Sequence, residues 1–136
     1  MRIFLDANVL FSAAKSDGSV RQLLMLLEKS GHECCVDAYV IEEARRNLVA
    51  KAPDRVVALE KLLPRMKKAG VQRSNLALEA SLPLPAKDRP VLAAAIGQSC
   101  TALVTGDRTH FGALYGRTIH GVTIHSPRSL AEALLV

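Results

Sequence analysis

The chain has 136 residues, of which 49% are hydrophobic, and a net charge of +5. This length fits a single domain over residues 1–136 that buries enough apolar surface to need no disulfides. No apolar run approaches the roughly 20 residues of a membrane span, and the three cysteines have no zinc-binding spacing. Asp6 and Asn8 interrupt an N-terminal stretch that otherwise resembles a signal peptide, so we expect a cytoplasmic protein.

Apolar patterning in the first half of the chain predicts two strands and three helices. Val20, Leu23, Leu24 and Leu27 have helical spacing, with Gly31 as a stop. Proline opens the last of the three helices, which we expect to end at a glycine. The expected strands are residues 2–5 and 32–37, and the expected helices are 19–30, 38–50 and the segment from Pro53 to Gly70.

The second half of the chain continues the alternation of strands and helices. A proline-rich loop over residues 82–88 precedes a helix that starts near Asp88 and runs to Cys100. The remaining expected elements are strands at 71–74, 102–104 and 121–125 and a terminal helix at 126–135, capped by Ser126. This order predicts an α/β fold with a central, mostly parallel sheet of about five strands.

Four carboxylates from four separate segments are predicted to meet at one edge of that sheet. Asp6 and Asp107 each follow a predicted strand, Asp88 opens a helix, and Glu43 lies one turn into the helix after the second strand. Ligands of open α/β sheets bind outside the carboxyl ends of the strands. Converging carboxylates require a cation, and an all-oxygen site favours Mg²⁺ or Mn²⁺. Taken singly, Asp88 also fits a helix cap and Glu43 a surface residue.

Positive charge gathers in one segment of the chain. Between Arg45 and Arg73 there are nine Lys or Arg and two acids. Such asymmetry favours a polyanionic partner, although a solvated helix face gives the same pattern. On the helix after Pro53 we expect a phosphate-binding stripe, joined by cations of the preceding helix. The residues predicted to contact the phosphates of such a partner are Arg45, Arg46, Lys61, Arg65 and Lys68.

The motifs that carry these acids resemble those of PIN-domain nucleases. The stretches "FLDANVLFSAA", "DAYVIEEARRNL" and "AKDRPVLAAAIGQSCTALVTGDRTHFGAL" are similar to the four motifs of that family, in order, at steps of 37, 45 and 19 residues. The closing "GVTIHSPRSLAEALL" resembles the bacterial branch regarded as toxin components of toxin–antitoxin pairs. The resemblance covers nearly the whole chain.

The resemblance implies a Rossmann-like three-layer PIN fold, dependence on Mg²⁺ or Mn²⁺, and cleavage of single-stranded RNA. It also implies an antitoxin protein and a second copy of the chain as partners. Catalytic and metal-binding roles fall on Asp6, Glu43, Asp88 and Asp107, with Glu43 preferred to Glu42 on motif register. Supporting roles fall on Asn8, beside Asp6, and on the hydroxyl of Thr105.

One departure from the family pattern follows the last acid. Some members carry a further aspartate there, whereas this chain has Arg108, Thr109 and His110. We therefore expect a second metal to be weakly held or absent. We interpret His110 as an exposed loop histidine rather than a substrate contact.

Two other readings of the sequence stay open. A metal-free ribonuclease would use His and Lys for acid–base chemistry and leave cyclic phosphate ends, but no histidine pair has a spacing that favours it. A catalytically degenerate PIN fold would only bind RNA or a protein. The presence of all four acids argues against that alternative.

Overall fold

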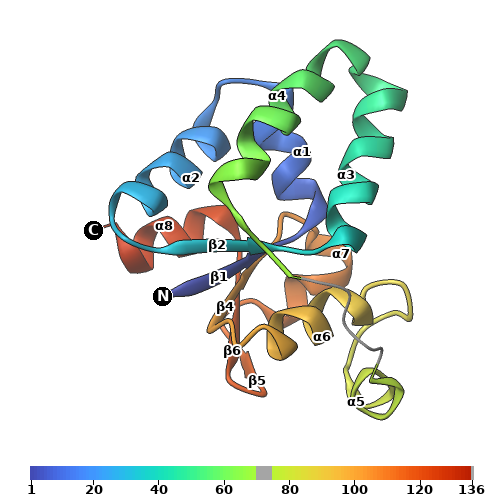
Figure 1. Cartoon of the computed structure of the whole chain (residues 1–136). Helices are drawn as coiled ribbons and strands as arrows, with labels where there is room; N and C mark the ends of the chain where they lie inside the picture. The colour runs from blue at the N-terminus through green and yellow to red at the C-terminus, as the bar shows by residue number, and fades with distance from the viewer. Residues whose placement is uncertain (70–74, 136) are drawn as a thin grey trace.

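The computed structural model describes residues 1–69 and 75–135, and a six-stranded sheet lies at its centre (Figure 1). The sheet order is β3-β2-β1-β4-β6-β5, and all neighbouring strands are parallel except the β5–β6 pair. This confirms the predicted, mostly parallel α/β sheet. The strands are β1 (Arg2–Leu5), β2 (Glu33–Val36), β3 (Lys67–Lys68), β4 (Ala102–Val104), β5 (Thr118–Ile119) and β6 (Val122–His125).

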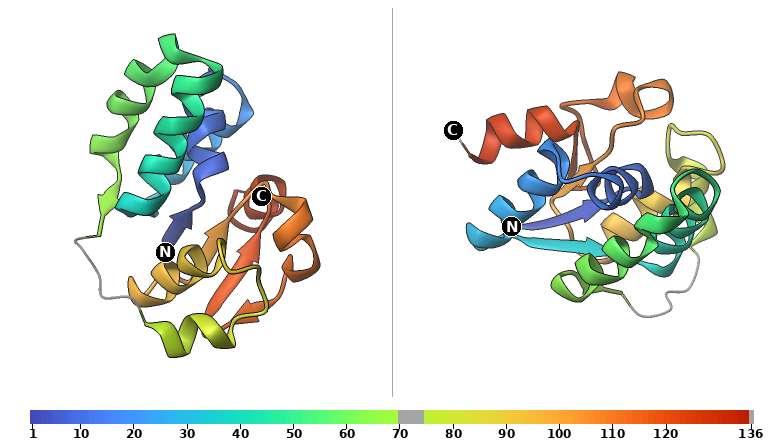
Figure 2. Two further views of the ribbon diagram at one scale, coloured as in Figure 1. Left: turned by 90° about the vertical axis from the view of Figure 1, so that its right-hand side faces the viewer. Right: turned by 90° about the horizontal axis from the view of Figure 1, so that it is seen from above.

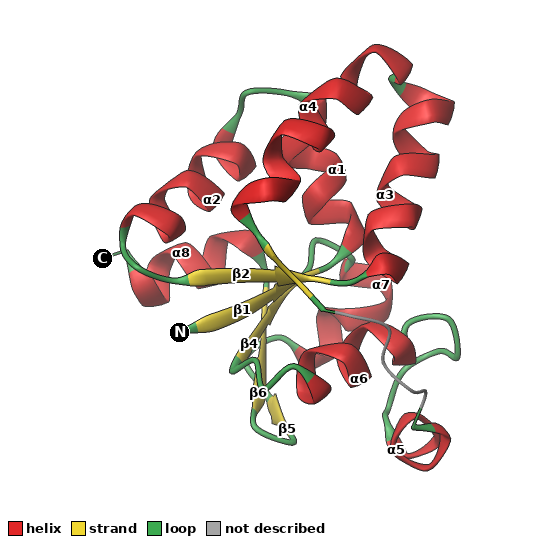
Figure 3. Ribbon diagram, viewed as in Figure 1, coloured by secondary structure: helices red, strands yellow, loops and turns green. Residues whose placement is uncertain are grey.

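Helices cover both faces of the sheet, which makes three layers (Figures 1, 2 and 3). One face carries α1 (Ala7–Lys15), α2 (Ser19–Lys29), α3 (Ala38–Lys51) and α4 (Val56–Leu62). The other carries α6 (Arg89–Gly97), against which α5 (Leu76–Ser81) packs. The one-turn helix α7 (Arg108–Phe111) follows β4, and α8 (Pro127–Leu134) packs on β6 and α2. Because both faces are covered, Ile3, Phe4 and Leu5 of β1 are all fully buried.

Two helices have ends at or near the positions that local sequence signals predicted. The α2 helix buries Leu23, Leu24 and Leu27, and Gly31 just beyond it has a positive φ of 86° that suits glycine. Ser126 caps α8 through a reciprocal pair of hydrogen bonds with Ser129. Backbone signals of this kind act over a few residues, so sequence alone is enough to find them.

The segment after Pro53 differs from the prediction. A 3₁₀ turn at Pro53–Arg55 leads into α4, and a second 3₁₀ turn at Leu63–Arg65 ends the helical run well before Gly70. Pro64 lacks the N–H that would continue an α-helix, which explains the early end. The third strand is the exposed pair Lys67–Lys68, while the strand predicted at 71–74 lies outside the described residues.

Other differences are short elements that the sequence analysis did not predict. The helices α1, α5 and α7 and the strand β5 are additional. The helix predicted from Asp88 to Cys100 ends at Gly97, and the chain then turns through Ser99, whose φ is +57°. None of the helices in residues 1–69 and 75–135 has the length and apolar character that crossing a membrane requires.

The topology places a switch point between β1 and β4. From β1 the chain moves outward to β2 and β3, whereas from β4 it moves the opposite way to β6 and β5. The two strands pair in parallel, with Leu5 opposite Val104. The loops that leave them therefore diverge from a shared carboxyl edge, which is where open α/β sheets bind ligands.

Candidate functional site

Asp6 lies at this switch point and is almost completely buried. It directly follows β1, is 6% exposed, and its backbone N–H donates to the carbonyl of Val104 (3.1 Å). Its Oδ1 accepts from the N–H of Ala7 (2.8 Å), so the carboxylate also caps α1. Its Oδ2 accepts from the hydroxyl of Thr105 (2.7 Å) and from Nδ2 of Asn8 (3.1 Å). Both oxygens are therefore held in fixed directions.

The pKa of Asp6 reflects how the other acids are arranged around it. Burial raises this pKa, and the hydrogen bonds from Thr105 and Ala7 partly offset that shift. The negative charges of Glu43 and Asp88 raise the same pKa further, so both residues are close enough to act on it. A buried carboxylate with two negative neighbours is a place where a cation is favoured.

Thr105 and Asn8 hold the loop after β4 against the start of α1. The fully buried Thr105 hydroxyl accepts from Nδ2 of Asn8 (3.2 Å) and from the N–H of Asp107 (3.1 Å). The Oδ1 of Asn8 accepts from the N–H of Gly106 (2.7 Å), and a Cβ at Gly106 would lie only 3.3 Å from that oxygen. The two predicted supporting residues thus connect Asp6 with the loop that carries Asp107.

Glu43 reaches the site from α3, whose first turn is capped by the side chain of Asp37 (Asp37 Oδ1 to Val40 N, 3.1 Å). Glu43 is partly buried, whereas Glu42 is exposed. Tyr39, one turn before Glu43, has a pKa raised by burial and then by the charges of Glu43 and Asp88. Glu43, rather than Glu42, therefore shares the electrostatic environment of the aspartates.

Asp88 occupies the cap position of α6, but its side chain makes no capping hydrogen bond. The phenol of Tyr39 donates to the backbone carbonyl of Lys87 (2.8 Å) and so ties α3 to this loop. Burial raises the pKa of Asp88, the interactions with His110 and Lys87 lower it, and the charge of Asp107 raises it. The alternative interpretation of Asp88 as a simple helix cap therefore does not explain the direction of its side chain.

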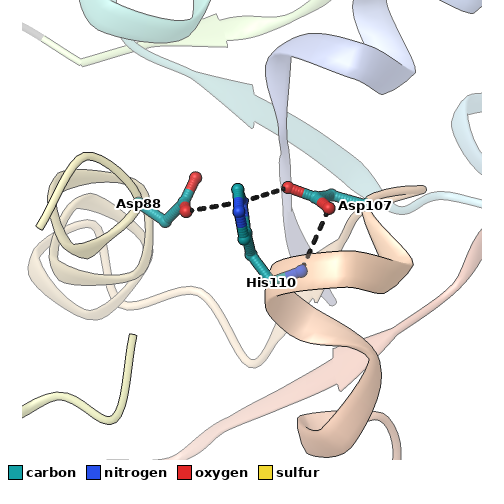
Figure 4. Close-up of side chains that lie close together, drawn as sticks. All are labelled: Asp88, Asp107 and His110. Carbon is teal, nitrogen blue, oxygen red and sulfur yellow. Dashed lines mark hydrogen bonds and ion pairs between the residues drawn. The ribbon is translucent and has the colours of Figure 1, made fainter. Parts of the chain in front are cut away.

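His110 is part of this cluster, so its interpretation as an exposed loop histidine was wrong. Its Nδ1 lies 3.0 Å from Asp88 Oδ2 and 2.9 Å from Asp107 Oδ2. Figure 4 shows the imidazole between the two carboxylates. The cause is local: Asp107 caps α7 by accepting from the N–H of His110 (3.1 Å), which places residue i+3 beside the capping carboxylate. An Asp followed three residues later by a His at a helix start was the signal that sequence analysis missed.

The short distances around His110 are not hydrogen bonds. Asp88 Oδ2 and His110 Nδ1 are both buried atoms with no hydrogen-bond partner among the described residues. The distances satisfy an ion pair, but the angles that an N–H donor requires are not met. One donor atom from each of Asp88, Asp107 and His110 lies within 4.8 Å of the others. Unpartnered buried donors of this kind fit a divalent cation.

The predicted basic stripe does not exist as one helical face. The helix carrying Lys61 ends at Leu62, Arg65 lies in the following 3₁₀ turn, and Lys68 lies in β3. Arg65 also pairs with Glu28 (3.0 Å). Lys61, Arg65 and Lys68 have helical spacing in the sequence, but Pro64 ends the helix between the first and second of them. The prediction of a stripe considered the charges and overlooked this proline.

The two arginines predicted on α3 differ from each other. Arg45 pairs with Glu60 (2.7 Å) and so joins α3 to α4. Arg46 is exposed, and its charge acts on Tyr39 beside the acids. Of the predicted cations, Arg46 is thus the one that the structure relates to the carboxylate cluster.

Comparisons with known proteins agree with this architecture. The sequence matches the PIN domain family over residues 2–109. VapBC2 from Rickettsia felis, solved with a DNA fragment from its promoter, has a TM-score of 0.70 at 17% identity, covering 93% of this chain and 98% of that one. FitAcB from Neisseria gonorrhoeae has a TM-score of 0.59 at 18% identity (93% and 98% covered).

VapC20 from Mycobacterium tuberculosis, described as a sarcin-ricin loop cleaving toxin, has a TM-score of 0.57 at 14% identity, covering 87% of this chain and 97% of that one. A comparison with curated proteins found no match. At these identities the solved structures establish the fold alone, and the family rests on the match over residues 2–109.

Proposed function

Because the chain belongs to the PIN-domain family, we propose that it is a metal-dependent endoribonuclease that hydrolyses phosphodiester bonds of single-stranded RNA. The observation that carries this proposal is the group of acidic side chains from separate segments at the switch point of the sheet. The charges of Glu43 and Asp88 act on buried Asp6, and the charge of Asp107 acts on Asp88. A polyanionic substrate could not approach such a group without a cation.

Mg²⁺ or Mn²⁺ would be held by Asp6, Glu43, Asp88 and Asp107. When bound, such an ion neutralises charge on the phosphodiester and lowers the pKa of a water that it coordinates. The chain's own residues orient the carboxylates: Thr105 and Asn8 fix one oxygen of Asp6. Burial raises the pKa of Asp6 and of Asp88, and a cation in the pocket would favour the ionised form of both carboxylates.

RNA would reach the carboxylates along the basic segment. Arg46 is exposed and its charge acts on Tyr39 beside the acids, and Tyr39, which is 41% exposed, offers a ring on which a base could stack. The other predicted cations would contact the phosphate backbone without reading sequence. They are Arg45, Lys61, Arg65 and Lys68.

We propose further that the protein is the toxin half of a toxin–antitoxin pair, with a small antitoxin protein as partner and a homodimer as its assembly. The support is that VapC20, which shares the fold, is described as a toxin, and that VapBC2 was solved bound to a DNA fragment from its promoter. Co-expression with the product of the neighbouring gene tests this. A stable complex that suppresses cleavage supports the pairing, and separate elution of two active proteins contradicts it.

The nuclease is tested with purified protein and single-stranded RNA in Mg²⁺, Mn²⁺ or excess EDTA. We expect cleavage with either metal, none in EDTA, and none from a folded Asp107→Asn variant. Activity that persists in EDTA and leaves cyclic phosphate ends would favour a metal-free ribonuclease instead. RNA binding with no cleavage under any condition would favour the degenerate PIN fold as a binding module.

A further inference from the structure

His110 is not one of the four expected metal-binding residues, yet it lies between two of them, Asp88 and Asp107. It enters from α7, between Asp88 on the loop before α6 and Asp107 at the end of the β4 loop (Figure 4). Its side chain is 27% exposed, and Nδ1 itself is a buried atom. A surface histidine held only by packing would not place that nitrogen against two carboxylates.

We propose that His110 Nδ1 is a ligand of the cation held by the carboxylates and that this nitrogen makes the site select Mn²⁺ over Mg²⁺. The inference rests on the proposed metal-dependent function and deepens it. It requires the imidazole tautomer with its proton on Nε2, because only an unprotonated Nδ1 can donate to a metal.

The distances around Nδ1 fit a coordination sphere. In an octahedral site with ligand bonds of about 2.1 Å, neighbouring ligand atoms lie about 3.0 Å apart. Asp88 Oδ2 and Asp107 Oδ2 lie 3.0 and 2.9 Å from Nδ1. Figure 4 shows the two carboxylates on opposite sides of the ring. Neither forms a hydrogen bond with Nδ1, so the electron pair of this nitrogen is not used by either carboxylate.

The donor set determines which ion is preferred. Mg²⁺ is a hard ion that prefers oxygen ligands and retains several waters. An imidazole nitrogen contributes more to first-row transition ions, for which affinity rises along the series that begins at Mn²⁺. Replacing an oxygen or a water by Nδ1 of His110 therefore shifts the site away from Mg²⁺. A further carboxylate just after Asp107 would instead have favoured Mg²⁺. This chain has Arg108, Thr109 and His110 at these positions.

The nitrogen can be detected directly on Mn²⁺ bound to the purified protein. Pulsed electron paramagnetic resonance records the modulation caused by a coordinated ¹⁴N, and the free Mn²⁺ signal gives the Kd. We expect ¹⁴N modulation in the wild type and its loss in His110→Gln. That variant should also bind Mn²⁺ about tenfold more weakly or worse, which is at least the effect of removing a partner of a metal ligand. Its Mg²⁺ affinity should change less.

Two further variants make the result specific. His120→Asn removes another imidazole from the exposed β5–β6 turn, where φ is +48°, and should keep the wild-type signal and Kd. His110→Asn offers an amide oxygen near the position of Nδ1, so it should bind Mn²⁺ without ¹⁴N modulation and with reduced preference over Mg²⁺. This second substitution keeps the test decisive if His110→Gln folds poorly.

The possible outcomes separate this inference from the proposed function. Tight Mn²⁺ binding without ¹⁴N modulation, or modulation that survives in both His110 variants, overturns the role of His110 while leaving the carboxylate site intact. Binding in His110→Gln that equals or exceeds the wild type has the same meaning, because the imidazole would then be only a counter-ion. Absence of any Mn²⁺ binding to the wild type overturns both.

Discussion

The hydroxyl of Thr105 lies 2.7 Å from Oδ2 of Asp6, although the two residues are 99 positions apart in the chain. Thr105 follows β4 and Asp6 follows β1, and these are the neighbouring strands between which the sheet changes direction. The same hydroxyl accepts from the N–H of Asp107. One buried oxygen therefore fixes the relative positions of two proposed metal ligands.

Replacing Thr105 by Val should destabilise the fold, because a nearly isosteric methyl leaves Asp6 without this donor. A hydrogen bond to a charged, buried group contributes about 1.5–3 kcal/mol. We expect a loss of that order in urea unfolding in EDTA. Thr118→Val is the control, since the Thr118 hydroxyl pairs with Thr123 at an exposed hairpin, and such surface changes usually stay within about 0.5 kcal/mol. Equal effects of the two substitutions would contradict the account.

Glu43→Gln should abolish metal-dependent cleavage, whereas Glu42→Gln should retain it. Glu43 is partly buried and its charge raises the pKa of Asp6, while its neighbour Glu42 is exposed. The pair is matched, because both variants remove one negative charge from adjacent positions of α3. Cleavage rates at saturating Mn²⁺ measure the difference. Loss of activity in Glu42→Gln alone would show that the motif register is shifted by one residue.

Asp88→Asn should raise the melting temperature at pH 7 in EDTA. The folded state raises the pKa of Asp88 above 3.8, chiefly by burial, so the folded protein holds this proton more tightly than the unfolded chain. The ionised carboxylate therefore opposes folding at every pH above its raised pKa, and this penalty disappears as the pH falls through that pKa. The variant's advantage should be largest at neutral pH and vanish in acid. Melting temperatures are measured across this pH range. If the variant melts no higher than the wild type at pH 7, the prediction is wrong.

Arg46→Gln should weaken RNA binding and reduce its salt dependence. Each phosphate neutralised on a single strand contributes about 0.7 to the slope of log K against log salt, so removing the cation that neutralises one phosphate should flatten the slope by about that amount. Lys29→Gln is the control: Lys29 is exposed at the end of α2, on the side of the sheet where β2 begins. If both variants change the slope equally, the effect is one of net charge and Arg46 binds no particular phosphate.

The alternation of strands and helices predicted the sheet. The positions of Asp6 and Asp107 after strands led to the prediction that the acids meet, because parallel strands bring their carboxyl ends to one edge, whatever lies between them. The helix α1 was missed because it begins directly after β1, with Asp6 acting as both strand end and helix cap. His110 was missed because a four-residue helix such as α7 has no periodicity to detect.

The edge of the sheet was mispredicted for a different reason. The strand β3 consists of two lysines, Lys67 and Lys68, which pair with Cys35 and Val36. Charged edge strands have no apolar alternation, because their side chains remain in solvent. Both residues were assigned to a helix, and Lys68 also to its basic stripe. The cations keep a helical spacing beyond Pro64, but the α-helix itself cannot continue through this proline.

The most direct test of the central claim is to compare Mn²⁺ binding with RNA cleavage in the same samples. If one cation held by Asp6, Glu43, Asp88 and Asp107 supports hydrolysis, the Kd from calorimetry and the half-saturation of the cleavage rate should agree in the wild type. Both should then weaken together in Asp6→Asn, Glu43→Gln, Asp88→Asn and Asp107→Asn, with far-ultraviolet circular dichroism confirming folded protein. Cleavage that is unchanged when a variant loses Mn²⁺ binding, or that continues in excess EDTA, would contradict the claim.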